Sequence, residues 1–131
     1  MVFLKPIDFE QQKSSFEKLR NLVNDDIGLI VVDSIIDPLK SQYPIAGEDL
    51  QNLQPRQKHL KVVIDKMKGI CMMHNCTVLY TNQVRIDIKN NELIPQGGNV
   101  LNHASDIRIQ LEPLSSDEGL EEVGIRIGKA T

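Results

Sequence analysis

The sequence predicts an α/β protein in which two parallel strands are joined through a long helix and are followed by an antiparallel β-hairpin. Two short β-branched runs, at 28–34 and 76–81, flank one strongly periodic helical segment at 55–75. Two later runs, at 107–111 and 123–127, alternate apolar and polar residues. Continuous apolar runs are typical of parallel strands, whereas alternation is typical of antiparallel strands with one face toward solvent.

The composition is that of an ordinary globular chain. Hydrophobic residues make up 40% and charged residues 25% of the 131 positions, and we expect one domain over residues 1–131. Apolar runs such as Leu29–Val32 are far shorter than the ~20 residues that cross a bilayer, and the N-terminus has no signal-peptide pattern. We therefore expect a cytoplasmic protein without a membrane partner.

The first two elements are an amphipathic helix and a strand. Asp8 followed three residues later by Gln11 fits a capping box, and apolar residues then recur at helical spacing as far as Asn24: Phe9, Phe16, Leu19, Leu22 and Val23. This spacing predicts the helix. The run 28–34 predicts a strand that is buried on both faces.

Residues 35–54 predict a loop with one short helical turn, because Pro38, Pro44 and Gly47 interrupt any period. Pro55 then suits the first position of a helix, where a missing N–H costs nothing. Five apolar residues follow at i, i+3, i+4, i+7 and i+11: Leu60, Val63, Ile64, Met67 and Cys71. We expect this second helix to end near Asn75 and to lead into the second strand.

Beyond Gln83 the pattern changes twice. Residues 84–104 show no sustained period and include the turn-forming segment Pro95–Asn99, so they predict a long loop of the functional or disordered kind. The alternating runs that follow predict a hairpin whose strands are joined by the acidic segment 112–122.

Asp33 stands where the first predicted strand ends. In an open parallel sheet, ligands bind at the carboxyl ends of the strands. An apolar run ending in Asp is typical of the Walker B carboxylate that holds Mg²⁺, usually through water. An Asp in this place equally often caps the following turn, so the pattern alone leaves both interpretations open.

Gln83 lies just past the second predicted strand, at the same sheet edge as Asp33 if the strands are neighbours. A side-chain amide can donate to a phosphate oxygen or orient a water without titrating. The alternative, which is more common in proteins at large, is a Gln at the start of a loop that bonds to nearby backbone.

Positive charge is concentrated in the second predicted helix, where residues 55–75 hold five basic side chains and one acid. That face is either a solvated surface or one that meets phosphates or an acidic partner. The next loop carries Arg85, Lys89 and the turn Gly97–Asn99, with no aromatic residue to stack on bases. Its cations and exposed N–H groups permit nucleic-acid binding without requiring it.

Other catalytic signatures are missing from the sequence. A phosphate-binding loop needs GxxxxGK[ST], and the nearest segment, 124–130, has its glycines one residue too close and Ala130 in place of the hydroxyl. The three histidines have no metal-ligand spacing. Cys71 and Cys76 match neither a redox pair nor a zinc site, so we expect reduced thiols without special chemistry.

Several of these segments resemble, in matching order, the archaeal and eukaryotic strand-exchange recombinases of the RecA type. The segments are Leu29–Ser34, Arg56-Gln57, Thr81–Val84, Gly97–Asn99 and His103-Ala104. The opening Phe3–Gln12 is more similar to the RadB branch of that family than to the RadA branch. The resemblance covers most of residues 28–108.

The resemblance implies a RecA-like P-loop NTPase core that binds ATP and Mg²⁺ and works on DNA in repair and homologous recombination. Asp33 would hold Mg²⁺ with Ser34 beside it in the cofactor site, and Gln83 would be the catalytic residue that senses the nucleotide. The DNA-binding residues would be Arg56, Arg85, Lys89, Gly97, Gly98 and Asn99. Partners would be single-stranded DNA and either a second copy of the chain or a RadA-type recombinase.

The sequence also departs from the family pattern. Residues 38–40 read Pro-Leu-Lys where an aromatic–Arg pair is common, and 43–56, the counterpart of the first DNA-binding loop, lacks its usual glycine–arginine pattern. These departures fit an accessory or mediator role. The Walker A loop and catalytic glutamate of the family would lie upstream of residue 1. We therefore expect a C-terminal part of the ATPase core, a fragment or truncated product that hydrolyses no ATP by itself.

Two other function classes stay open. One is a non-catalytic interaction module that binds a recombinase partner through an exposed sheet edge or the basic helix. The other is an ATPase regulator of the KaiC-like kind, against which the segments Thr81–Val84 and Gly97–Asn99 argue.

Overall fold

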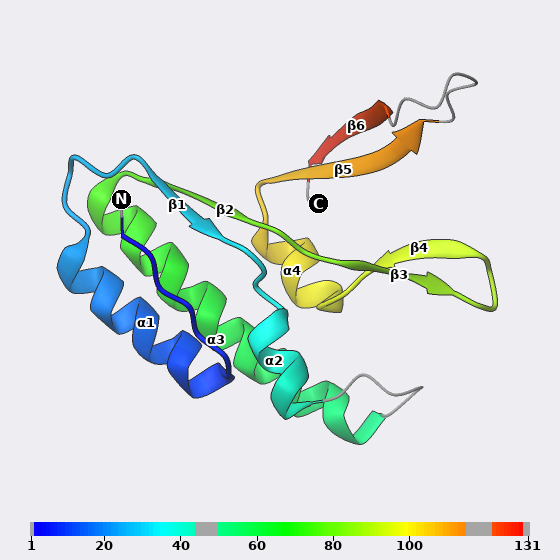
Figure 1. Ribbon diagram of the computed structural model, residues 1–131, viewed down its shortest axis with the longest axis horizontal. Helices are drawn as coiled ribbons and strands as arrows, with labels where there is room; N and C mark the ends of the chain where they lie inside the picture. The colour runs from blue at the N-terminus through cyan, green and yellow to red at the C-terminus, as the bar shows by residue number, and fades with distance from the viewer. Residues whose placement is uncertain (1, 44–49, 115–121, 130–131) are drawn as a thin grey trace. The chain divides into compact units, whose positions relative to one another are not determined.

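The computed structural model describes residues 2–43, 50–114 and 122–129 (Figure 1). The elements, in chain order, are α1 (Phe9–Leu22), β1 (Leu29–Val32), α2 (Asp37–Gln42), α3 (Leu50–His74), β2 (Thr77–Tyr80), β3 (Val84–Asp87), β4 (Glu92–Pro95), α4 (Gly98–Ala104), β5 (Ile107–Leu114) and β6 (Glu122–Lys129). The chain divides into two compact units, 1–98 and 99–131, which are described separately. The expectation of one domain over the whole chain stays a prediction. Among the described residues, no helix is long and apolar enough to span a membrane.

Helix α1 begins at the predicted cap. Asp8 Oδ1 accepts a hydrogen bond from the Gln11 backbone N–H at 2.8 Å, and Gln11 Oε1 accepts one from the Ile7 N–H at 3.3 Å. The first bond satisfies one of the N–H groups that a helix start leaves without a partner, and the second ties the residue before the cap to the first turn. Phe9 and Phe16 are buried on the inner face of the helix, so the predicted helix is confirmed.

Strands β1 and β2 form the predicted parallel pair, joined through α2 and α3 (Figure 1). The register places Leu29 opposite Thr77 and Val32 opposite Tyr80. Helix α3 packs against β2 and α1. Its apolar row is between 0% and 4% exposed at four predicted positions: Leu60, Val63, Ile64 and Met67. Asn75 follows the helix with a φ of 49°, the left-handed conformation that commonly ends a helix.

The predicted start of α3 is wrong. The helix begins at Leu50, so Pro55 lies inside it rather than at its first position. Proline keeps a helical φ but removes one backbone hydrogen bond, and a helix of 25 residues has many others. Before it, residues 37–42 form the helix α2, with Pro38 in its first turn. The predicted loop therefore contains two helical stretches, and residues 44–49 lie outside the described part of the chain.

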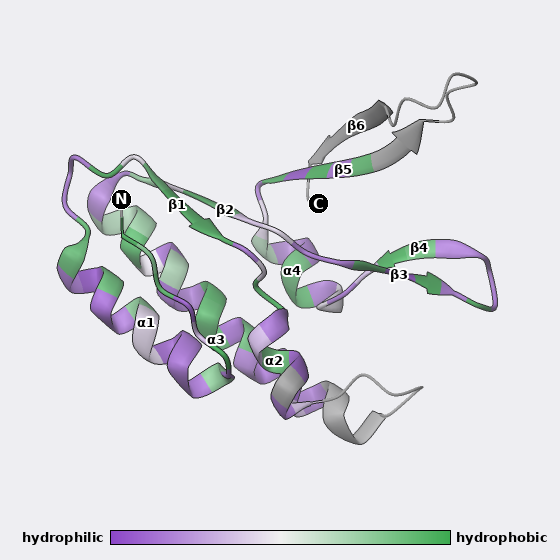
Figure 2. Cartoon of the chain, in the orientation of Figure 1, coloured by the Kyte–Doolittle hydropathy of each residue, from purple (hydrophilic) through white to green (hydrophobic). Residues whose placement is uncertain are grey.

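The prediction that the strands are buried on both faces is also wrong for this chain. Ile30 is 8% exposed, whereas its neighbours Leu29 and Val31 are 55% and 57% exposed, and Leu79 in β2 is 48% exposed. Figure 2 shows β1 as hydrophobic along its length. Burial alternates because the helices cover one face of the pair, so the opposite face presents aliphatic side chains to solvent.

Residues 84–104 do not form the predicted structureless loop. Strands β3 and β4 pair as an antiparallel hairpin, with Val84 opposite Pro95 and Asp87 opposite Glu92. Its turn is closed by the Asn91 N–H, which donates to the Asp87 carbonyl at 2.7 Å, and Asn91 has a φ of 53°. Asn tolerates this conformation better than other non-glycine residues. The segment then continues into the short helix α4.

In the second unit, β5 and β6 form the predicted antiparallel hairpin. Their register places Ile109 opposite Ile127 and Leu111 opposite Ile125. The connecting residues 115–121 lie outside the described part of the chain.

Candidate functional site

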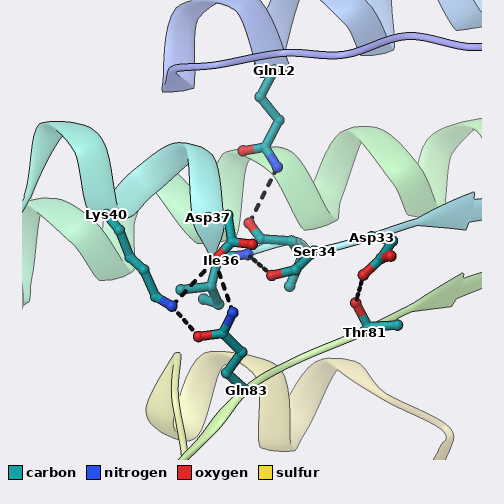
Figure 3. A network of polar contacts seen from close by, with 9 residues as sticks. Gln12, Asp33, Ser34, Ile36, Asp37, Lys40, Thr81 and Gln83 are labelled. Carbon is teal, nitrogen blue, oxygen red and sulfur yellow. Dashed lines mark hydrogen bonds and ion pairs between the residues drawn. The ribbon is translucent and has the colours of Figure 1, made fainter.

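The carboxyl ends of β1 and β2 bring Asp33 and Thr81 together. The Thr81 hydroxyl donates a hydrogen bond to Asp33 Oδ1 (Figure 3). The backbone continues the strand ladder here, since Thr81 N–H donates to the Val32 carbonyl at 3.0 Å and Ile35 N–H donates to the Thr81 carbonyl at 3.2 Å. The peptide bond between Asp33 and Ser34 is cis. The hydrogen bond from Thr81 holds the exposed Asp33 carboxylate at the edge of the sheet where ligands bind in such folds.

Gln83 bonds to α2 rather than to Asp33. Its Nε2 donates to Asp37 Oδ1 at 3.1 Å, and its Oε1 accepts from Lys40 Nζ (Figure 3). Lys40 Nζ also lies 3.2 Å from Asp37 Oδ1. The three side chains form a closed polar triangle that joins the first helix after β1 to the segment after β2. Lys40 belongs to the segment 38–40, which differs from the aromatic–Arg pair expected from the family resemblance.

The buried side-chain amide of Gln12 forms a hydrogen bond to the turn that follows Asp33. Gln12 is 2% exposed, and its Nε2 donates to the Ile35 carbonyl at 3.1 Å, while Ser34 Oγ accepts from the Ile36 N–H at 3.3 Å. The Gln12 Oε1 atom is buried without a hydrogen-bond partner among the described residues. A cavity of about 170 Å³ lies here, lined by Gln12, Asp33, Ser34 and neighbours from residues 4–6, α1 and β1.

The oxygen donors at this edge suit Mg²⁺. Carboxylate and hydroxyl oxygens are the protein ligands this ion takes, and it keeps several of its waters when bound by one or two carboxylates. Within the described residues no group of three or more His, Cys, Asp or Glu side chains could hold a metal, so Asp33 would bind chiefly through water. The residues present fit the metal, whereas the phosphate loop that a nucleotide needs is not among these 131 residues.

Two of the predicted DNA-binding residues, Arg56 in α3 and Arg85 in β3, lie close enough for their charges to interact. The pKa of the Arg56 guanidinium is lowered, first by burial and second by the positive charge of Arg85. Arg85 is exposed, and so is Lys89 at the tip of the β3–β4 hairpin. The Lys89 backbone N–H donates to Asp87 Oδ1 at 3.0 Å, which fixes the start of the turn. The structure therefore places cations on both α3 and the hairpin.

The glycine turn after the hairpin requires its glycines. Gly97 and Gly98 have φ angles of 87° and 56°, which L side chains rarely adopt. A Cβ on Gly98 would lie 2.7 Å from Gln57 Nε2 in α3. The Gln57 amide is the end of a flexible side chain and can move away, so the positive φ angles, rather than this contact, favour glycine here. These positions therefore have a structural role as well as the predicted one. Asn99 belongs to the second unit and is exposed.

Sequence reasoning missed three residues of this site: Gln12, Asp37 and Thr81. Thr81 was named in the sequence only as part of the segment Thr81–Val84. Its hydroxyl, two residues before Gln83, was the signal that could have added it to the site. Asp37 starts a helix ahead of Pro38, a pattern typical of a first turn. Gln12 has no local signal, because it is a polar residue on the apolar face of a helix and its partner lies 23 positions away.

Residues 5–122 match the Rad51 family. The chain belongs to this family. It is 30% identical over 112 residues to the DNA repair and recombination protein RadB of Methanococcoides burtonii, covering 86% of this chain and 48% of that protein. It is also 30% identical over 125 residues to the DNA repair and recombination protein RadA of Ignicoccus hospitalis, covering 92% of this chain and 37% of that protein.

The Rad51 match confirms the predicted family and the RecA-like α/β fold class, and it favours the recombinases over the KaiC-like alternative. A second RadB, from Thermococcus sibiricus, is 27% identical over 113 residues. The chain spans about half the length of these RadB relatives and less than two fifths of the RadA relatives.

Proposed function

We propose that this chain is the C-terminal part of the ATPase core of a RadB-like recombinase paralogue that acts in DNA repair and homologous recombination. The observation that carries the proposal is the hydrogen-bonded pair of strand ends, where Thr81 meets Asp33 and Gln83 follows two residues later. The relatives named DNA repair and recombination proteins support it. The phosphate-binding loop would come from a segment that these 131 residues lack.

In this proposal the Asp33 carboxylate would hold Mg²⁺, chiefly through water, with Ser34 beside it in the cofactor site. The Gln83 amide, which bonds to Asp37 and Lys40 in this structure, would contact the terminal phosphate of ATP, because an amide can donate to phosphate without titrating. The hydrogen bond from Gln12 to the Ile35 carbonyl stabilises the turn between β1 and α2. This turn, with the bond from the Ile36 N–H to Ser34, restricts the backbone that carries Asp33 and Ser34.

Mg-ATP binding tests the proposed cofactor site. Calorimetric titration of this chain should give no binding, whereas a protein extended upstream in its native reading frame through a phosphate loop should bind. In the longer protein, Asp33→Asn should weaken Mg-ATP binding at least about tenfold, or roughly 1.4 kcal/mol, because the carboxylate charge that attracts the ion is lost. Asp26→Asn changes the same functional group at an exposed position before β1 and should leave the affinity unchanged.

Two outcomes contradict this site. If the longer protein binds Mg-ATP equally well with Asp33→Asn, the carboxylate holds no metal. If the chain alone hydrolyses ATP when DNA is added, the phosphate-binding groups lie within these residues and the proposed division of the core is wrong.

We also propose that single-stranded DNA binds in the first unit along Arg56, Arg85, Lys89 and the turn of Gly97 and Gly98. The expected contribution of Asn99, which belongs to the second unit, stays a prediction. Support comes from the neighbouring charges of Arg56 and Arg85, since two like charges at close range gain from a phosphate between them. The exposed hairpin adds Lys89. No aromatic side chain lies in residues 84–104, so the contact would be chiefly electrostatic.

Salt dependence tests this surface. Arg85→Gln should weaken binding of a mixed-sequence single strand. It should also lower the slope of log affinity against log salt by about 0.7, the value for one phosphate contact on a single strand. Fluorescence anisotropy at several salt concentrations measures both. Arg20→Gln, on the exposed side of α1, is the matched control. An unchanged slope for Arg85→Gln would remove it from the interface.

The second candidate function is an interaction module that binds a RadA-type recombinase. The observation that favours it is the uncovered face of the β1–β2 pair, where Leu29, Val31 and Leu79 are about half exposed. Exposed aliphatic patches commonly mark protein interfaces. Co-elution with a RadA-type recombinase in the absence of DNA and nucleotide, lost in Val31→Asp, would favour this function if Mg-ATP binding fails in the longer protein.

A further inference from the structure

Two thiols lie in contact where α3 ends and β2 begins. Cys71 is in the last turn of α3, Cys76 directly precedes β2, and their sulfur atoms are 4.0 Å apart. Both cysteines are free. The contact arises because Asn75, with its left-handed φ of 49°, reverses the chain after the helix and returns Cys76 beside the preceding turn. A spacing of five positions gave no sign of this pairing in the sequence.

We propose that Cys71 and Cys76 are a modification site, forming a reversible intrachain disulfide by exchange with a low-molecular-weight disulfide such as oxidised glutathione. Neither thiol belongs to the nucleotide or DNA surface proposed above, so the inference stands apart from the proposed function. Within the described residues no third His, Cys, Asp or Glu joins them in a group able to hold a metal. Thiol chemistry is therefore the chemistry this pair offers.

The exchange proceeds in two steps. Cys71 reacts first, because it is half-buried whereas Cys76 is buried. Its thiolate attacks one sulfur of the small disulfide, forming a mixed disulfide and releasing one small thiolate. The Cys76 thiolate then attacks the Cys71 sulfur and releases the second small thiolate. The protein pair loses two protons and two electrons in total, and the small disulfide gains them as two thiols.

The distance and the local structure allow this step. A disulfide needs an S–S distance of about 2.05 Å, so the two sulfurs must approach by about 2 Å from their contact. The helix end between them is where local opening costs least, because terminal turns fray. Six residues from Cys71 to Cys76 would close the ring, and it would tie the last turn of α3 to the start of β2.

The environment makes the first step slow at neutral pH. Burial, together with the adjoining Cys76 thiol, raises the pKa of the Cys71 thiol to about 11. Only the thiolate attacks a disulfide, and at about pH 7 a thiol with this pKa is thiolate in roughly one molecule in ten thousand. The exchange should therefore accelerate about tenfold for each unit that the pH rises below that pKa.

The experiment uses the full 131-residue chain. Reduced protein is incubated with oxidised glutathione at about pH 7 and about pH 9, quenched with acid, alkylated and analysed by mass spectrometry without reduction. The expected product is a monomer that has lost two hydrogen atoms, with a peptide cross-linked between Cys71 and Cys76. It should form about a hundredfold faster at the higher pH and revert on addition of dithiothreitol.

Variants separate the roles of the two thiols. Cys76→Ser should stop at a stable glutathione adduct on Cys71, while Cys71→Ser should react more slowly because its remaining thiol is buried. Circular dichroism checks that each variant is folded, and the wild-type result stands without them. Accumulation of a glutathione adduct, of a disulfide-linked dimer or of unreacted thiols in the wild-type protein at the higher pH would overturn the proposal.

Discussion

Leu60→Ala should lower the free energy of unfolding by about 3 kcal/mol, within the range of roughly 2 to 5 kcal/mol for such substitutions. Leu60 is 0% exposed and lies in the apolar row of α3 that packs on α1 and β2. Its replacement loses the transfer free energy of the side chain and leaves a cavity that close-packed neighbours fill only partly. Urea unfolding followed by far-UV circular dichroism measures the change.

Met72→Ala is the matched control, because it truncates a large apolar side chain in the same helix at a position that is 87% exposed. It should change the free energy of unfolding by less than about 0.5 kcal/mol. Equal losses in the two variants would mean that α3 does not bury the face seen here. The unfolding slope should stay the same in both if only native-state packing has changed.

The regular elements were predictable because their causes are local. The row that begins at Leu60 repeats at helical spacing, and the structure buries it. The same holds for the cap at Asp8, where donor and acceptor are three residues apart. Asp33 and Gln83 were expected at one sheet edge from the strand order alone. The parallel pairing of β1 and β2 places the two strand ends that they follow at the same edge. Their roles in chemistry stay predictions.

What could not be predicted depends on contacts between distant parts of the chain. The bonds that Gln83 makes join positions 43 and 46 apart, and no periodicity encodes them. Residues 84–89 do carry a strand signal, because apolar and charged residues alternate over these six positions. The hairpin was missed because the returning strand, Glu92–Pro95, does not alternate and the turn lacks an Asn-Gly pair. Whether the second face of β1 is buried depends on other residues that pack over that face. The composition of the strand itself does not show whether such residues are present.

Pro55→Ala should raise the free energy of unfolding by about 2 kcal/mol. Proline inside a helix is about 3 kcal/mol less favourable than alanine, and part of that gain is lost because proline restricts the unfolded chain by up to about 1 kcal/mol. The structure places Pro55 as the sixth residue of α3, where an alanine would restore one backbone hydrogen bond. Urea unfolding compares the variant with the parent chain.

The sequence pattern predicted a different helix start, with Pro55 at the first helical position. There the missing N–H would cost nothing, and alanine should bring no gain in stability. Stability therefore discriminates between the two helix boundaries. Pro38→Ala is the control, because Pro38 lies in the first turn of α2 and is buried. It should give no gain and a small loss of packing. If Pro55→Ala behaves like Pro38→Ala, α3 starts near residue 55 and the turn before it has no helical hydrogen bond to recover.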